Sequence, residues 1–303
     1  MRKILLSLMA LATVGFAAGA ARASEEMVTP PQAEWTFKGV FGTFDRDALR
    51  RGFQVYNEVC QNCHSLKLIA YRDLRKIGFS EDEVKAIAAS KEVQAGPNDD
   101  GEMYMRPATP ADHFVPPFPN DNAAKAANGG ALPPDLSLII KARKNGPDYV
   151  RAILNGYADL SSDSEKEAAY EIVYHARMEE YESRLVDYEA AIAAGRQADK
   201  PTPPAKVSSA DQLGLADGMN FNVFFKGFGI AMPEPLSADA VTYADGTKAT
   251  VAQMSHDVVT FLAWTASPEL EARKRLGVKV MIFLLVLTAL MYALKRKIWE
   301  DVH

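Results

Sequence analysis

Apolar positions divide the chain into two terminal runs and a central region with helical periodicity. The first run covers residues 4–18 and the second covers residues 276–294. Between them, Leu49, Phe53 and Tyr56 recur at spacings of four and three, which places them on one face of an α-helix. The pattern predicts a mainly α-helical domain between two segments that interact with a membrane or its export machinery.

The first apolar run has the features of a secretory signal. Arg2 and Lys3 precede it, and Ala21-Arg22-Ala23 follows it with small residues at the positions that a signal peptidase requires. We therefore predict a signal peptide at residues 1–23 and an exported mature chain from Ser24. An uncleaved anchor is the alternative, but the run is short for a membrane span.

The second apolar run predicts a single transmembrane helix within residues 270–298. A helix over residues 276–294 rises about 28 Å, close to the thickness of the hydrocarbon core. Its one charge, Lys279, lies near the first turn, where its side chain can reach the head groups. Pro268 predicts a bend just before the helix.

Basic clusters at residues 273–275 and 295–297 flank this helix equally, so they do not choose an orientation. The export of the N-terminus does determine the orientation. It predicts residues 24–269 on the periplasmic side of a bacterial inner membrane and residues 299–303 as a cytoplasmic tail.

The charge of the chain indicates what it binds. The formal net charge is −5, and removal of Arg2, Lys3 and Arg22 with the signal would take it to −8. An acidic exported domain does not favour nucleic acid. It favours a basic soluble partner, whose encounter with the domain would be faster at low salt.

The two cysteines lie together in Cys60-Gln61-Asn62-Cys63-His64. This C-x-x-C-H spacing is the attachment pattern of c-type haem, in which both thiols bind the porphyrin and the histidine binds the iron. A zinc site would need further soft ligands, and a thioredoxin-like pair would need alternating strands and helices. A disulfide across two residues would be strained. The pattern predicts one covalent haem, with Asp45 capping a helix that leads to it.

A second axial ligand is expected in an electron carrier, and a methionine opposite the histidine raises the reduction potential. Position along the chain leaves six candidates, which are Met219, Met232, Met254, His113, His175 and His256. Met232 is favoured, because Gly227 and Gly229 before it allow close backbone approach to a flat cofactor and Pro233 and Pro235 fix the loop after it.

The chain resembles the cytochrome c1 family, the haem-bearing subunit of the bacterial quinol–cytochrome c oxidoreductase, or bc1 complex. The resemblance covers the mature chain and rests on a set of motifs, namely residues 51–56 (RGFQVY), 65–66 (SL), 71–74 (YRDL), 128–137 (NGGALPPDLS), 148–150 (DYV) and 231–233 (AMP). It implies a one-electron carrier with no catalytic acid, base or nucleophile of its own, bound to cytochrome b in the membrane lipid. It also implies that a Rieske iron–sulfur protein supplies the electrons and a soluble c-type cytochrome accepts them.

The same resemblance implies the site residues. Met232 would be the axial ligand opposite His64, and Arg143 would pair with a haem propionate. Tyr149, Pro134 and Asn128 would line the haem pocket.

The chain departs from the family pattern in two ways. It has no further cysteine pair to fasten the loop before Met232, so packing must hold this loop. Residues 159–212 are longer than the minimal pattern and predict a helical insertion with an apolar seam, formed by Tyr174, Met178, Tyr181, Leu185, Tyr188 and Ile192. Docking of this insertion on a partner or on its own domain is equally compatible with the pattern.

The predicted fold is mainly α, a class I cytochrome c-like haem domain with long loops at residues 115–119 and 132–134. A small hairpin is expected over residues 241–250, around Asp245-Gly246. Two other functions compete. One is a membrane-tethered monohaem cytochrome c of another respiratory or reductase complex, which usually has its anchor at the N-terminal end. The other is a tethered haem sensor, which would need an open iron position.

Overall fold

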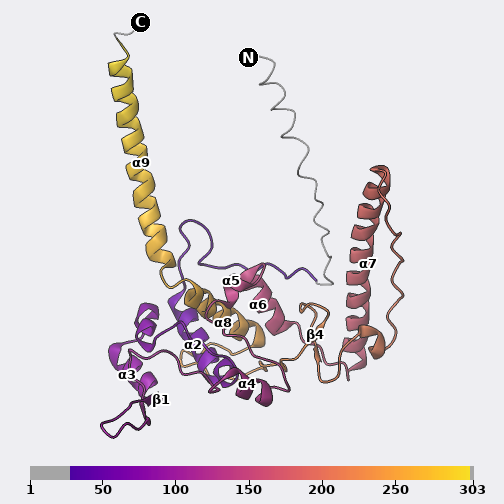
Figure 1. The fold of residues 1–303 in the computed structure, drawn as a ribbon, viewed down its shortest axis with the longest axis horizontal. Helices are drawn as coiled ribbons and strands as arrows, with labels where there is room; N and C mark the ends of the chain where they lie inside the picture. The colour runs from indigo at the N-terminus through magenta and orange to yellow at the C-terminus, as the bar shows by residue number, and fades with distance from the viewer. Residues whose placement is uncertain (1–27, 301–303) are drawn as a thin grey trace. The chain divides into compact units, whose positions relative to one another are not determined.

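A computed structural model describes residues 28–300, so the predicted signal peptide lies outside the described residues. The chain forms two compact parts, which are a main domain of residues 28–173 and 207–300 and an arm of residues 174–206. The main domain is mainly helical, as predicted (Figure 1). Its elements are α2 (Arg46–Glu58), η1 (Cys60–Asn62), η2 (Tyr71–Ile77), α3 (Glu81–Ala89), β1 (Glu92–Ala95), β2 (Tyr104–Pro107), α4 (Asp121–Ala127), α5 (Ile139–Ala142), α6 (Gly146–Asn155), η3 (Ala210–Leu213), β3 (Asn220–Phe221), β4 (Gly229–Ile230), α8 (Val251–Ala266) and α9 (Leu270–Ile298).

Helix α2 begins where the sequence predicts. The Asp45 side chain accepts hydrogen bonds from the backbone N–H groups of Asp47 at 2.9 Å and Ala48 at 3.2 Å. These bonds satisfy donors that a helix N-terminus otherwise leaves unpaired. The predicted apolar face of this helix is buried, and the rings of Phe53 and Tyr56 each lie 5.8 Å from that of Phe261 in α8.

The core forms where α2 packs against α8. Gly52 permits this contact, because a Cβ atom at that position would lie 2.0 Å from the carbonyl oxygen of Asp257. Any larger side chain would force the two helices apart. This packing fixes the direction in which α2 delivers the chain to Cys60.

A buried ion pair joins the same two helices. The guanidinium of Arg51 contacts both carboxylate oxygens of Asp257, at 2.9 and 3.1 Å, and donates to Asp245 at 2.8 Å. Burial alone would raise the pKa of Asp257, but the neighbouring His256 and hydrogen bonds from Arg51 and Gln253 outweigh it and lower the pKa. The carboxylate is therefore charged in the folded protein and completely buried.

Replacing Asp257 with asparagine is expected to lower the free energy of unfolding by roughly 3 kcal/mol, because it leaves Arg51 with only the exposed partner Asp245. A carboxyl group with a lowered folded-state pKa stabilises the protein above its unfolded pKa of about 3.9, and the effect is lost as the pH falls through the folded value. The difference between wild type and D257N should therefore shrink in acid. Denaturant titrations at neutral and acid pH measure it, with the exposed Asp217→Asn as control.

Strands are short in the part of the chain that the structure describes. Strands β1 and β2 pair antiparallel with Glu92 opposite Pro107, and β3 pairs with β4 with Phe221 opposite Gly229. The prediction of a hairpin over residues 241–250 is wrong, because this segment has a turn but no strand. The carboxylate of Asp245 accepts from the Thr247 N–H and from Arg51, so side-chain bonds to α2 hold the segment where a ladder was expected.

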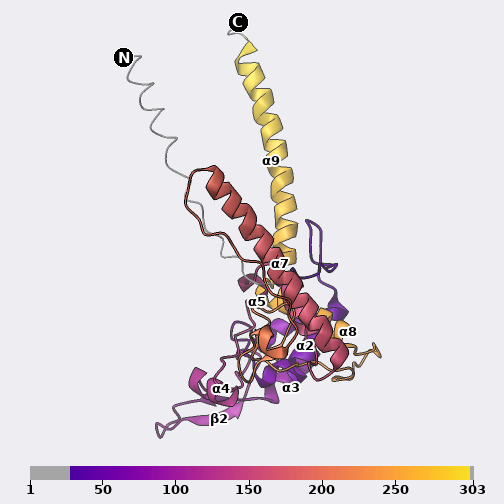
Figure 2. The same cartoon turned by 90° about the vertical axis from the view of Figure 1, so that its right-hand side faces the viewer.

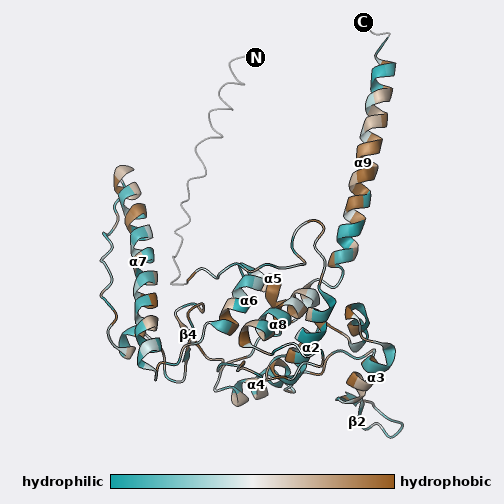
Figure 3. Ribbon diagram, turned by 180° about the vertical axis from the view of Figure 1, so that it is seen from behind, coloured by the Kyte–Doolittle hydropathy of each residue, from teal (hydrophilic) through white to brown (hydrophobic). Residues whose placement is uncertain are grey.

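Helix α9 is the one helix between residues 28 and 300 that is long and apolar enough to cross a membrane. Figure 3 shows its apolar middle between polar ends. The break predicted at Pro268 is present, since α8 ends at Ala266 and α9 begins at Leu270. Residues 115–119 and 132–134 form irregular loops, also as predicted.

The long helix α7 (Asp163–Ala193) starts in the main domain and continues into the arm. Within the arm, Tyr174, Met178, Leu185 and other members of the predicted seam are half-buried, whereas Ile192 is exposed. Figure 2 shows the irregular segment after α7 returning beside the helix.

Candidate functional site

The cysteine motif forms a tight turn at the end of α2. The backbone N–H groups of Cys63 and His64 both donate to the carbonyl oxygen of Cys60, at 3.2 and 2.9 Å. The Cys63 side chain is exposed, while burial raises the pKa of the Cys60 thiol to about 12. One short turn thus holds two free thiols and an imidazole.

The imidazole of His64 has its tautomer fixed by the protein. Its Nδ1 atom lies 2.8 Å from the carbonyl oxygen of Pro134. A carbonyl oxygen only accepts, so Nδ1 carries the hydrogen and Nε2 keeps its lone pair. Burial also lowers the pKa of His64, which favours the neutral ring. Metal-binding histidines have this arrangement, in which one nitrogen binds the metal and the other donates to a fixed acceptor.

A carboxylate that the sequence analysis did not single out fastens the Pro134 segment to the motif. Asp135 accepts from the Ser65 hydroxyl at 2.8 Å and from the backbone N–H groups of Lys67 and Ser137 at 2.9 Å each. The N–H of Leu136 donates to the Ser65 carbonyl at 2.9 Å. The local bond to Ser137 is typical of Asp-x-Ser sequences, whereas nothing in the sequence indicated the bonds across to Ser65 and Lys67.

The Met232 backbone is held by hydrogen bonds. Its carbonyl oxygen accepts from the Tyr157 hydroxyl at 3.1 Å and from the Asn220 side-chain amide at 3.3 Å. Just before it, the Phe228 side chain is fully buried, and the Phe228 carbonyl accepts from the N–H of Asn222 at 2.8 Å. Hydrogen bonds therefore hold the loop before Met232, in addition to the packing that the sequence analysis expected. The hydroxyl of Tyr157 is a positioning group that sequence reasoning missed.

Replacing Tyr157 with phenylalanine keeps the ring and removes the hydroxyl that holds Met232. We expect a loss of about 1 kcal/mol in the free energy of unfolding. If Met232 binds the haem iron, as the sequence predicts, a small fraction of the reduced protein should also bind carbon monoxide, because the loop carrying Met232 opens more often. Denaturant titration and carbon monoxide difference spectra measure the two effects. The exposed Tyr104→Phe is the control and should change neither.

The other methionines and histidines considered for the second axial position differ in burial and in their contacts. The Met254 side chain is completely buried in the core, and Met219 is exposed. His256 stacks on Trp35 with ring centroids 4.9 Å apart. His113 has its Nδ1 2.8 Å from the Lys67 carbonyl oxygen, and His175 lies in the arm.

The predicted pocket residues are held by different elements. Pro134 contacts His64 directly, as described above. Tyr149 in α6 is half-buried, and burial raises its pKa despite the smaller opposing effect of the nearby Arg143. The exposed Arg143 follows α5 and donates to the Ala142 carbonyl at 3.3 Å. Asn128 caps the C-terminal end of α4, with its side-chain amide donating to the Ala124 carbonyl at 2.7 Å.

This donor set fits a haem. It offers two thiols on one turn for covalent attachment, a neutral imidazole with Nε2 available, and a methionine on a loop that hydrogen bonds hold in place. Imidazole and thioether are the ligands that haem iron takes in c-type cytochromes. The motif and its surroundings define the class of the protein as a monohaem c-type cytochrome.

Comparison with known proteins shows to which family of c-type cytochromes the chain is similar. The family model described as the Cytochrome C1 family matches residues 35–302. Cytochrome c1 of Rhodospirillum rubrum is 47% identical over 290 residues, which is 94% of this chain and 92% of that protein. A cytochrome b/c1 of Bradyrhizobium diazoefficiens is 44% identical over 93% of this chain and 37% of its own length. A mitochondrial cytochrome c1 heme protein of Arabidopsis thaliana is 42% identical over 91% of this chain and 73% of its own length.

The chain belongs to the cytochrome c1 family. It is an electron-carrier subunit of the bc1 complex, and it carries one covalently attached haem c.

Proposed function

We propose that Cys60 and Cys63 attach the haem and that His64 and Met232 are its axial ligands. The bond between His64 Nδ1 and the Pro134 carbonyl carries this proposal, because it leaves the lone pair of Nε2 free to bind iron, on the residue that directly follows Cys63. The bound haem supplies reversible one-electron chemistry. The chain orients the imidazole through Pro134, and Tyr157 and Asn220 hold the backbone of Met232.

Arg143, Tyr149, Pro134 and Asn128 complete the proposed pocket. An exposed guanidinium suits a haem propionate, since its planar fork matches a carboxylate and it stays charged at any physiological pH. Arg143 also lies near the half-buried Tyr149, since its charge opposes the rise in the Tyr149 pKa that burial causes.

The electron path that we propose runs from a Rieske iron–sulfur protein, through this subunit, to a soluble c-type cytochrome. Association with cytochrome b is supported by the relative named cytochrome b/c1, of which this chain matches 37%. The negative formal charge of the chain favours a basic soluble acceptor. Asp99 and Asp100, in the loop between β1 and β2, are exposed and could contribute to that attraction.

We place the protein in a bacterial inner membrane. Residues 1–23 are the signal peptide, residues 24–269 the periplasmic haem domain with its 159–212 insertion, residues 270–298 the anchor and residues 299–303 the cytoplasmic tail. The class I cytochrome c-like fold is proposed for the haem domain. The length and apolar character of α9 support the anchor. A C-terminal tag protected from protease in sealed cells, and cleaved after lysis, would support the orientation.

Membranes containing the protein test the electron path. Adding a quinol should reduce the haem, seen as the α-band of a ferrous c-type cytochrome. A basic soluble cytochrome c added afterwards should then become reduced, at a rate that falls as salt is raised. Oxidation of the quinol while the haem stays ferric would contradict the proposed position of this subunit in the path.

A further inference from the structure

A tight loop at residues 36–43 presents two apolar side chains at its tip. The N–H of Thr43 donates to the Thr36 carbonyl at 3.0 Å and closes the base of the loop. Gly42 cannot be replaced without distortion, because a Cβ atom there would lie 1.9 Å from the Lys38 carbonyl oxygen. At the tip, Val40 is 68% exposed and Phe41 is 82% exposed. Phe41 is the most exposed large apolar side chain between residues 28 and 300.

The base of this loop is fastened to the start of α9. The Lys274 ammonium donates to the carbonyl oxygens of Phe37 at 2.7 Å and Gly42 at 2.9 Å. One turn earlier, Glu271 accepts from the backbone N–H of Phe44 at 2.8 Å. The rings of Phe37 and Phe44 are buried and lie 5.1 Å apart. The loop therefore stands in a fixed position beside the helix.

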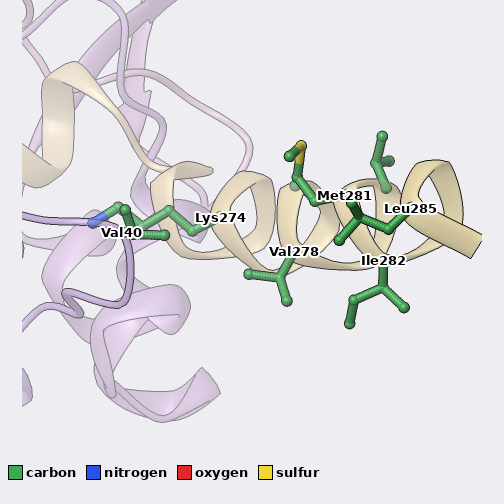
Figure 4. A pocket seen from close by; sticks show the side chains of 8 residues that line it. Val40, Lys274, Val278, Met281, Ile282 and Leu285 are labelled. Carbon is green, nitrogen blue, oxygen red and sulfur yellow. The ribbon is translucent and has the colours of Figure 1, made fainter. Parts of the chain in front are cut away.

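Val40, at the tip of the loop, lies beside the start of the apolar part of α9. Val40 shares a groove with one charged residue, Lys274, and with six residues of the apolar run, which are Gly277, Val278, Val280, Met281, Ile282 and Leu285 (Figure 4). The basic cluster at residues 273–275 marks the level of the lipid head groups. Gly277 and Val278 come about one turn further into the hydrocarbon. Val40 is thus placed at the boundary between the head groups and the hydrocarbon.

We propose that Val40 and Phe41 insert into the outer lipid leaflet beside α9 and give the haem domain a second attachment to the bilayer. The occupant is lipid rather than a protein groove, because Val40 continues the apolar surface of the helix that we propose to span the membrane, and the side chains of Val40 and Phe41 lack polar atoms. The inference rests on the proposed membrane anchor. Two points of attachment would limit tilting of the domain on its single helix.

Photocrosslinking of the full chain in native membranes tests this insertion. Phe41 is replaced by p-benzoylphenylalanine, which is also aromatic, and the membranes are irradiated. We expect the peptide containing position 41 to gain the mass of a phospholipid. The same replacement of Leu285 reports on the anchor and should also give a lipid adduct. The same replacement of Tyr104, exposed in β2, should give none.

Each outcome decides the proposal. Lipid adducts at positions 41 and 285, with none at 104, support insertion of the loop. A shift of the haem-stained band by the mass of another subunit at position 41, or a lipid adduct at 285 alone, overturns it while leaving the anchor intact. Absence of lipid adducts at both 41 and 285 overturns the insertion, and the anchor proposal falls with it when position 285 also gives no crosslink to another membrane subunit.

Discussion

Replacing Met232 with leucine is expected to lower the midpoint reduction potential by on the order of 100 mV or more, and to let carbon monoxide bind the reduced protein. Leucine has nearly the same volume but no sulfur, so the change removes the proposed axial ligand and little packing. Axial ligands set haem potentials over a range of ~0.8 V, and a methionine ligand raises the potential. A redox titration of the α-band measures the shift, and a carbon monoxide difference spectrum reports the open position.

Two methionines provide matched controls for this substitution. Met254→Leu changes a completely buried side chain in α8, and Met219→Leu changes an exposed one. Both variants should keep the wild-type potential and exclude carbon monoxide. An unchanged potential in M232L would remove Met232 from the iron, and a large shift in M254L or M219L would point to that residue instead.

Replacing both Cys60 and Cys63 with serine is expected to abolish the haem-stained band on a denaturing gel. The sequence has only these two cysteines, so no other thiol can form a thioether to the porphyrin. Each single variant should keep one covalent link and stain more weakly. A blot against a C-terminal tag gives the amount of protein, so loss of haem is separated from loss of the chain.

The matched control for the cysteine variants is Asn62→Ser, an exposed position on the same turn. Its side chain donates only to the Glu58 carbonyl at 3.3 Å among the bonds described, so the turn should survive the change. Full haem staining is expected. Covalent haem in the double serine variant would show that attachment does not use this motif.

Features encoded within a few residues could be predicted from the sequence. The cap at Asp45 and the apolar face of α2 depend on spacings of three and four, and the break at Pro268 depends on one residue. The long apolar helix α9 was also expected from its composition. These properties are local, so sequence patterns report them directly.

Features that depend on distant partners could not be predicted. The pair between Arg51 and Asp257 joins positions far apart in the chain, and Arg51 also binds Asp245 in the segment where the hairpin was expected. The bonds that orient the site, from His64 to the Pro134 carbonyl and from Tyr157 to the Met232 carbonyl, also cross the fold. Their residue types are common in loops and have no distinctive spacing, so only the folded chain brings them together.

The measurement that tests the central claim most directly is purification from mild-detergent membranes through a C-terminal tag, followed by optical and EPR spectra of what co-purifies. The account predicts covalent haem c together with b-type haems and the EPR signal of a Rieske iron–sulfur cluster. Haem c alone, with neither of those partners, would contradict the assignment to a bc1 complex and leave a membrane-tethered cytochrome that works by itself.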